Sequence, residues 1–361
     1  MSRPKRKTSE EALRDALTMI SPGTKLREAI ASVLQSGNGA LICLGDSRRL
    51  DDISEGGVEV NAPLTPQLLY ELTKMDGAII VTGDASRILA ANRFLKPDAG
   101  IPSKETGTRH RAAERTARQA KCMVITISEE RARVTLYVNE LKHQLDSLPT
   151  LLNKATQAIQ ALEKYTNVLK QSMQELSARE FQDMVTIFDV CQAIQRCEMV
   201  VRIAREIDPY LLELGVEGRL INLQLQELIL PVEEAQLVIK DYYRAKPGTT
   251  YEQVLEKIRG FSQQELLDLS DISQALGYGP NPRSVDTYLT PRGYRILTLT
   301  QRLTPQVIEN LIARFDSLQA IMRASKDELQ DVDGVGDVLA ERVRSSLNLL
   351  RSQVVMDRGA R

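Results

Sequence analysis

Short runs of branched aliphatic residues alternate with segments of helical composition over roughly the first 145 residues. Four runs have the composition of β-strands and are bounded by Gly, Asp, Ser or Asn: residues 39–44, 77–82, 121–127 and 131–138. Between them, residues 66–75 and 109–120 have helical composition. Strands that alternate with helices predict an α/β domain in which helices flank one mixed sheet.

The pattern changes to that of long helices after residue 150. Residues 150–208 contain neither Gly nor Pro, and their apolar residues recur mostly at spacings of three, four or seven: Leu152, Ile159, Leu162, Leu169, Met173 and Leu176. Helical pattern continues through 220–243 and 251–276 until the Gly- and Pro-rich segment 277–282. We interpret the Leu and Met stripes as a packed core, so this all-α region is a spine or linker.

The last region, from about residue 286, contains two predicted helical hairpins. The turn Val332-Asp333-Gly334-Val335-Gly336 precedes a helical run over 337–350. Glycines in such a turn permit positive φ angles and let helix N-terminal amides approach a phosphate, which favours sequence-independent DNA binding. A plain helix–helix turn is the alternative. The DNA-binding candidates are the turn and two arginines of the following helix: Gly334, Val335, Gly336, Arg342 and Arg344.

The other hairpin, over 294–315, lacks the double glycine and has Leu303-Thr304-Pro305 at its turn, so we interpret it as structural support. The region from 286 onward holds eleven lysines and arginines against ten acidic residues. Such a balance predicts modest, salt-sensitive DNA binding. The three patterns divide the 361 residues into domains 1–145, 146–285 and 286–361, as expected for a chain too long for one core.

Charge and cysteine content narrow the function classes. The net charge of −1 does not itself indicate a nucleic-acid partner, so DNA binding has to come from a local patch. The four cysteines form no C-x-x-C pair and the two histidines are not clustered, which argues against a structural zinc site. We see no signal peptide and no apolar run long enough to span a bilayer. The chain is expected to be cytoplasmic, with nucleoid association possible and no membrane partner.

Two segments of the first domain carry charged residues where helices and strands meet. Asp76-Gly77-Ala78 lies between a helical segment and a strand, and the segment Gly-Thr-Arg-His-Arg at 107–111 opens a helix. Each motif is weak alone, because Asp-Gly is a common turn. Together they supply what a triphosphate needs: two arginines, a histidine and helix N-terminal amides, with a carboxylate for a divalent cation.

These motifs, together with the strand end Ser128-Glu129-Glu130-Arg131, resemble the diadenylate cyclase family. The helical middle and the helix-hairpin-helix tail follow in the order typical of its DNA-binding members, so the resemblance spans the whole chain. It implies that two ATP molecules are condensed into cyclic di-AMP and two pyrophosphates. It further implies active sites that face each other across subunits, a homo-octamer, and branched or damaged DNA as a regulating partner.

The resemblance also implies a role for each motif residue. Asp76 would bind Mg²⁺ or Mn²⁺ and help to activate the 3′-hydroxyl, while Gly77 and Leu95 would contact adenine. The phosphates would be held at the helix start and a strand end, by Thr108, Arg109, His110, Arg111 and Ser128. Relatives often place Thr directly after Arg-His-Arg. This chain has Ala112 there, so one hydroxyl contact is missing although the backbone N–H remains.

Three questions stay open at this point. We prefer His110 as a phosphate donor, with a general base as the alternative, and either Arg109 or Arg111 could serve a subunit interface instead of the nucleotide. The alternative function is a DNA-binding scaffold that senses ATP without turning it over. A repair-coupled ATP or GTP hydrolase would ordinarily carry a Walker loop, G-x-x-x-x-G-K-[ST], which this sequence lacks.

Overall fold

The computed structural model describes residues 9–45, 48–129, 133–244, 248–282, 288–300 and 302–359. Its contacts divide the chain into two compact units, one of Met1–Gln157 with Ile207–Asn222 and one of Ala158–Glu206 with Leu223–Arg361. The division falls within three long helices. The predicted motif residues Glu130 and Arg131 lie outside the described residues.

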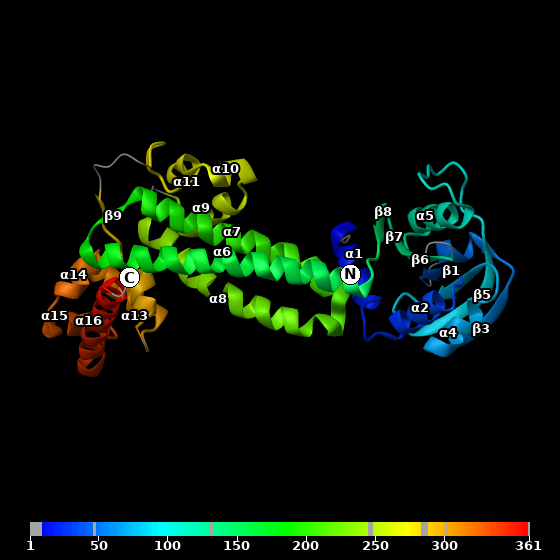
Figure 1. Ribbon diagram of the computed structural model, residues 1–361, viewed down its shortest axis with the longest axis horizontal. Helices are drawn as coiled ribbons and strands as arrows, with labels where there is room; N and C mark the ends of the chain where they lie inside the picture. Colours follow the sequence, from blue (N-terminus) through cyan, green and yellow to red (C-terminus); the bar gives the residue numbers. More distant parts are fainter. Residues whose placement is uncertain are drawn as a thin grey trace. The chain divides into compact units, whose positions relative to one another are not determined.

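A mixed eight-stranded sheet forms the centre of the first unit (Figure 1). Its strands follow the order β2-β5-β4-β1-β6-β7-β8, and β3 pairs with β5. Only the β1–β4 pair is parallel among the described strands. The strands are β1 (Ala40–Leu44), β2 (Ser54–Glu55), β3 (Val58–Pro63), β4 (Ala78–Val81), β5 (Arg87–Leu95), β6 (Met123–Ser128), β7 (Arg133–Val138) and β8 (Leu141–Gln144).

Helices cover both faces of this sheet because its central strands bury residues on both sides. Along β1, Ala40, Ile42 and Leu44 join one core with helices α1 (Ser9–Met19), α2 (Lys25–Gln35) and α4 (Pro66–Leu72). Leu41 and Cys43 point the other way and pack with α3 (Arg48–Asp51) and α5 (Thr108–Ala120). Figure 1 shows α5 and the pair α2 and α4 on opposite sides of the strands. The predicted α/β architecture is confirmed.

The apolar runs in the sequence predicted the four central strands of the sheet but did not predict the others. The runs predicted near 39–44, 77–82, 121–127 and 131–138 correspond to β1, β4, β6 and β7. The long strand β5 was missed because Arg87, Asn92 and Arg93 interrupt its apolar pattern. Its pairing with both β3 and β4 stabilises it instead, and this pairing depends on tertiary contacts.

The second unit, which shares three long helices with the first, is mainly helical, as predicted. Helices α6 (Leu148–Gln182), α7 (Ile187–Leu214) and α8 (Arg219–Tyr242) run alongside one another (Figure 1). The predicted helical stretch breaks at Asp183, which adopts a positive φ of 56°, before a short strand β9 (Val185–Thr186). Helix α7 begins beyond this break and continues through Pro209. A single-turn 3₁₀ helix, Gly215–Gly218, leads into α8.

Shorter helices complete this unit. Three of them precede the last region: α9 (Tyr251–Arg259), α10 (Gln263–Leu267) and α11 (Leu269–Ala275). The last region has strand β10 (Tyr288–Leu289), which pairs with β9, and helices α12 (Tyr294–Thr298), α13 (Pro305–Phe315), α14 (Leu318–Arg323), α15 (Lys326–Gln330) and α16 (Asp337–Gly359). Both predicted hairpins are present. None of the helices in the described ranges is long and apolar enough to cross a membrane.

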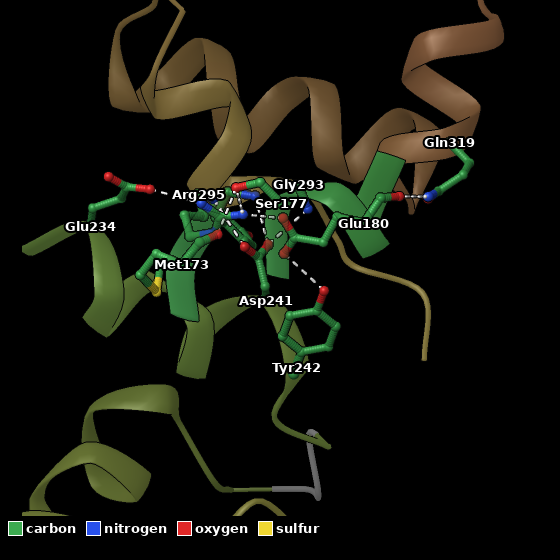
Figure 2. A network of polar contacts seen from close by, with 10 residues as sticks. Met173, Ser177, Glu180, Glu234, Asp241, Tyr242, Gly293, Arg295 and Gln319 are labelled. Carbon is green, nitrogen blue, oxygen red and sulfur yellow. Dashed lines mark hydrogen bonds and ion pairs between the residues drawn. The ribbon is translucent and has the colours of Figure 1, made fainter. Parts of the chain in front are cut away.

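A buried polar network joins the last region to the long helices (Figure 2). The side chain of Arg295 is buried, and its guanidinium forms an ion pair with Glu180. It also donates hydrogen bonds to Ser177 at 2.9 Å and Glu234 at 2.7 Å. The carboxylate of Asp241 accepts three backbone N–H bonds at the start of α12, at 2.6–3.0 Å. These contacts fix α12 against α6 and α8. The sequence patterns did not predict this network.

Candidate functional site

The two predicted motifs meet at one edge of the sheet. Ile42 of β1 lies opposite Ile79 of β4, and Ala40 of β1 lies opposite Ile127 of β6. Continued to the strand ends, this register places Gly39 between Asp76 on one side and Ser128 on the other. Because neighbouring strands are about 4.8 Å apart, Asp76 and Ser128 are roughly 10 Å apart at the backbone.

The start of β4 is built closely against β5. Gly77 has a φ of +87°, and a Cβ there would lie 2.8 Å from the carbonyl oxygen of Arg93. Glycine is therefore required at this position. Leu95 ends β5 two residues beyond Arg93, half-buried at the same edge of the sheet as the exposed Asp76. The turn and the strand end that were predicted to contact adenine are thus neighbours.

Helix α5 points its N-terminus at this edge. Gly107 is the N-cap residue and offers no side-chain cap, so amides of the first turn are directed outward from Thr108 onward. The guanidinium of Arg109 lies across the start of β1, where a Cβ on Gly39 would be 2.1 Å from it. The absence of a side chain at Gly39 therefore leaves space for the Arg109 guanidinium between β4, which follows Asp76, and β6, which ends at Ser128.

The loop before α5 is held by side chains of the helix itself. Glu114 accepts hydrogen bonds from the Ser103 hydroxyl at 2.5 Å and the Lys104 amide at 3.2 Å. Arg111 donates to the carbonyl oxygens of Glu105 at 3.4 Å and Thr106 at 3.2 Å. The guanidinium of Arg111 therefore braces the loop in this structure, whereas that of Arg109 lies over the sheet edge.

His110 packs toward the sheet. Its Nδ1 lies 2.9 Å from the Tyr137 hydroxyl of β7 and 3.2 Å from the Thr126 hydroxyl of β6. The two rings meet edge to face, with centroids 6.2 Å apart. Burial, and then the nearby Glu105 carboxylate, raise the pKa of Tyr137, so the phenol stays protonated.

A cavity of about 280 Å³ opens beside His110. Lys142 of β8 lies at its wall and forms an ion pair with Glu105 at 2.5 Å. Burial opposes ionisation of Glu105, but hydrogen bonds from Lys142 and Tyr137 outweigh it, so the pKa of this carboxyl is lowered. The cavity is lined by residues of the loop, α5 and three strands: Glu105, Thr106, Gly107, His110, Ser128, Arg133, Thr135, Lys142 and Gln144.

The structure therefore gathers most of the predicted site residues at one place. His110 and Ser128 share the cavity, and the sheet register brings Asp76, Gly77 and Leu95 to the same edge. Thr108 and Arg109 lie at the helix start beside it, while Ala112 is half-buried one turn further along α5. The sequence reasoning missed Tyr137, which contacts His110, and six residues that line the cavity: Glu105, Thr106, Arg133, Thr135, Lys142 and Gln144. Glu105 and Thr106 had a local signal, since they stand directly before the Gly107 turn.

The single carboxylate of Asp76 suits a divalent cation whose other ligands come from a bound nucleotide and water. In the described part of the chain, no three His, Cys, Asp or Glu side chains are grouped to hold a metal ion. Asp76 is a single exposed carboxylate at the sheet edge. Mg²⁺ typically binds one or two carboxylates together with substrate phosphates and water, so this donor set fits a cation that arrives with a nucleotide.

The predicted DNA-binding turn joins α15 to α16. Gly334 has a φ of +84°, and a Cβ there would lie 3.2 Å from the Val307 side chain. Val335 is buried, its amide donates to the Val332 carbonyl at 3.0 Å, and Asn310 donates to the Asp333 carbonyl at 2.9 Å. A Cβ on Gly336 would instead meet nothing within 4 Å. The turn is thus held rigidly, with open space in front of the α16 N-terminus.

The two predicted arginines of α16 differ in placement. Arg342 is half-buried and Arg344 is exposed, and the buried Val343 lies between them. Because successive helix residues are rotated by about 100°, the two guanidinium groups leave opposite sides of the packed face. At most one of them can therefore approach the same phosphate as the turn.

Comparison with known proteins agrees with this architecture. Residues 27–141 match the family described as DisA bacterial checkpoint controller nucleotide-binding, and 145–285 match the DisA bacterial checkpoint controller linker region. Residues 305–353 match the helix-hairpin-helix motif. Similar proteins named DNA integrity scanning protein DisA come from Carboxydothermus hydrogenoformans (49% identity, covering 94% of this chain and 96% of the relative) and Clostridium tetani (44%, covering 96% of each).

Proposed function

Because the chain belongs to the family of the DNA integrity scanning protein DisA, and is therefore a diadenylate cyclase and a nucleotidyltransferase, we propose that its first domain condenses two ATP molecules into cyclic di-AMP. The 3′-hydroxyl oxygen of each ATP attacks the α-phosphorus of the other. A new O–P bond forms, the bond from the α-phosphorus to the bridging oxygen breaks, and pyrophosphate leaves with that oxygen. Two ATP thus give one cyclic di-AMP and two pyrophosphates.

This proposal depends on one observation: Asp76, Arg109 and Ser128 lie at the same edge of the sheet. A carboxylate and a guanidinium separated by about two strand spacings can act on opposite ends of one ATP. Leu95 and Gly77 lie next to Asp76 and would contact the adenine. The polyphosphate would then extend over Gly39 toward Ser128 and the 280 Å³ cavity.

Catalysis in this site consists of positioning and charge neutralisation. A divalent cation, Mg²⁺ or Mn²⁺, would be held by Asp76 and the phosphates and would supply positive charge at the reacting centre. Arg109, the first-turn amides from Thr108 onward and His110 would stabilise the negative charge that develops on pyrophosphate. Asp76 would orient the 3′-hydroxyl, and Arg111 would keep the loop before α5 in place. Ala112 contributes only its backbone N–H.

One protomer supplies only half of what the reaction needs. Each ATP is at once the nucleophile and the electrophile, so two sites have to face each other across a two-fold axis. We propose that cyclase domains pair in this way within a homo-octamer. A protomer that cannot pair would bind ATP without releasing product.

The last region would bind DNA through the Gly334–Gly336 turn, with Arg342 or Arg344 adding a phosphate contact. Branched or damaged DNA bound there would lower the rate of the cyclase. We place the functional domains at 1–145, 146–285 and 286–361. A titration with junction DNA at saturating occupancy tests this regulation, and an unchanged cyclase rate would refute it.

The activity itself is tested by incubating the protein with ATP and Mn²⁺ and separating the nucleotides by mass. Cyclic di-AMP is expected. Unchanged ATP would support the alternative of an ATP-sensing DNA-binding scaffold, and ADP would indicate a hydrolase. Asp76→Asn should abolish the product while leaving the assembly intact. Asp84→Asn is the matched control, because Asp84 lies beyond the opposite end of β4, in the turn that leads to β5.

A further inference from the structure

Strand β8 has different contacts on its two faces. Lys142 and Gln144 line the 280 Å³ cavity, and Lys142 pairs with Glu105 at 2.5 Å. His143 lies between them and points the opposite way, because successive side chains of a strand alternate between its faces. Its Nε2 lies 2.6 Å from Oε1 of Glu213, near the end of α7. One strand therefore contacts the cavity on one face and a long helix on the other.

The pair of His143 and Glu213 is largely shielded from water. The Glu213 side chain is 8% exposed and that of His143 is 29% exposed. A carboxylate only accepts hydrogen bonds, so Nε2 of His143 donates this one. The second carboxylate oxygen of Glu213 is buried and has no hydrogen-bond partner among the described residues. Because a buried carboxylate without partners is costly, Glu213 depends on the bond from His143.

Strand β8 lies at the edge of the sheet. Among the described strands it pairs with β7 alone, over Leu141 to Gln144. An edge strand has ladder hydrogen bonds on one side only, so it opens more easily than a central strand. The bond between His143 and Glu213 adds an attachment that the sheet itself does not supply. Movement of β8 would displace Lys142 and Gln144 in the cavity wall.

Helix α7 extends from this attachment into the helical part of the chain. Its residues 207–214 belong to the first unit and 187–206 to the second. Directly before α7, Thr186 pairs with Tyr288 of the last region through β9 and β10. The Thr186 hydroxyl also donates to Asp189, in the first turn of α7, at 2.7 Å. One continuous helix thus links the region that would bind DNA with the strand that lines the nucleotide cavity.

We propose that His143 and Glu213 couple α7 to the nucleotide site, as positioning residues that fix β8 and with it the cavity wall of Lys142 and Gln144. This inference deepens the proposed cyclase function and rests on it for the identity of the substrate. It also names the contact through which DNA bound to the last region would lower the rate. Substitutions along a chain of contacts of this kind change the coupling between two sites by about 2- to 30-fold.

Glu213→Leu tests the coupling, because it removes the bond to His143 and keeps a buried side chain of similar size. Hydrogen exchange of the full-length protein should then be faster in β8 and unchanged in β4. The Kd for 3′-deoxy-ATP with Mg²⁺ should rise by about 2- to 30-fold. This analogue lacks the attacking hydroxyl, so binding is measured without turnover. Glu213→Gln keeps an acceptor for Nε2 and should restore both the exchange rate and the affinity.

Ile88→Val is the matched control for a loss of stability alone. Ile88 is buried in the same unit, on β5, which is far from β8 in the strand order. The shorter side chain should lower Tm without changing the Kd for 3′-deoxy-ATP. An unchanged Kd in Glu213→Leu, or an equal loss of affinity in Ile88→Val, would show that the pair is only structural.

The response to DNA provides an independent measurement. Junction DNA at saturating occupancy should inhibit Glu213→Leu less than the wild type, because a displacement of α7 no longer reaches β8. Equal inhibition of the two proteins would refute the coupling. If DNA left the wild-type rate unchanged, the proposed DNA regulation would be wrong, while exchange in β8 and binding of the analogue would still decide the role of the pair. A wild-type protein that does not bind the analogue would instead refute the cyclase function.

Discussion

Replacing Arg295 by methionine should destabilise the second unit more than any surface change. The Arg295 side chain is 1% exposed and bonds Glu180, Ser177 and Glu234 (Figure 2). Methionine fills much of the volume but leaves the fully buried Glu180 without its cation. Breaking a buried ion pair in this way costs about 3–5 kcal/mol. The reason is the uncompensated charge that remains in the core.

The expected change in melting temperature follows from the size of the unit. The second unit contains about 190 residues, for which 1 kcal/mol shifts Tm by about 2–4 °C. Arg295→Met should therefore lower the transition of this unit by roughly 6–20 °C. Differential scanning calorimetry should show the shift in the transition of this unit, with the transition of the cyclase unit unchanged. Lys326→Met is the control, because it removes an exposed pair with Asp337 and should shift Tm by less than about 2 °C.

The pH dependence and a second substitution sharpen this test. Burial raises the pKa of Glu180, and loss of Arg295 removes the group that opposes this rise. A raised carboxyl pKa favours the native state below the ordinary value of 4.5, and this advantage is lost as pH rises. The deficit of Arg295→Met should therefore be small below pH 4.5 and grow above it. Adding Glu180→Gln should recover stability at neutral pH. A deficit under 1 kcal/mol at pH 7, or a double variant less stable than Arg295→Met, would refute the reasoning.

Three further predictions address the turns and the cysteines. Gly336→Leu should abolish DNA binding with Tm unchanged, because a side chain at this position meets only open space. Gly334→Ala should instead lower the Tm of the second unit, because residue 334 has a φ of +84° and lies close to Val307. The opposite pattern in a DNA-binding assay and a thermal melt would contradict this prediction. Hydrogen bonds from Thr82 and Ser86 lower the pKa of Asp84 to about 2, so its support of the folded state should be present above pH 3.8 and disappear as pH falls through 2. An NMR titration midpoint near 3.8 would exclude these bonds. Burial raises the pKa of the Cys122, Cys191 and Cys197 thiols to about 12, and that of Cys43 well above its usual value, so iodoacetamide at pH 8 should modify none of the four until the protein unfolds.

Local sequence signals determined much of the architecture. Apolar runs in the sequence identified β1, β4, β6 and β7, since each forms a strand whose burial depends on its own composition. Helical spacing identified α6 to α8 for the same reason. Thr304 and Pro305, which the sequence places in the turn of the hairpin, mark the start of α13, because an N-cap and a proline at the first helical position act on the adjacent backbone. The Asp76 and Arg109 motifs were equally readable in the sequence.

Only the tertiary structure decided what these elements do together. The sequence does not contain the register that aligns Asp76, Gly39 and Ser128, because hydrogen bonds between strands far apart in the chain set it. The same holds for the contact between His110 and Tyr137, and for Arg295, which is buried only because Glu180 approaches it from a helix more than 100 positions earlier. A charged side chain is buried only where a distant partner offsets its desolvation, and periodicity along the chain carries no information about that partner.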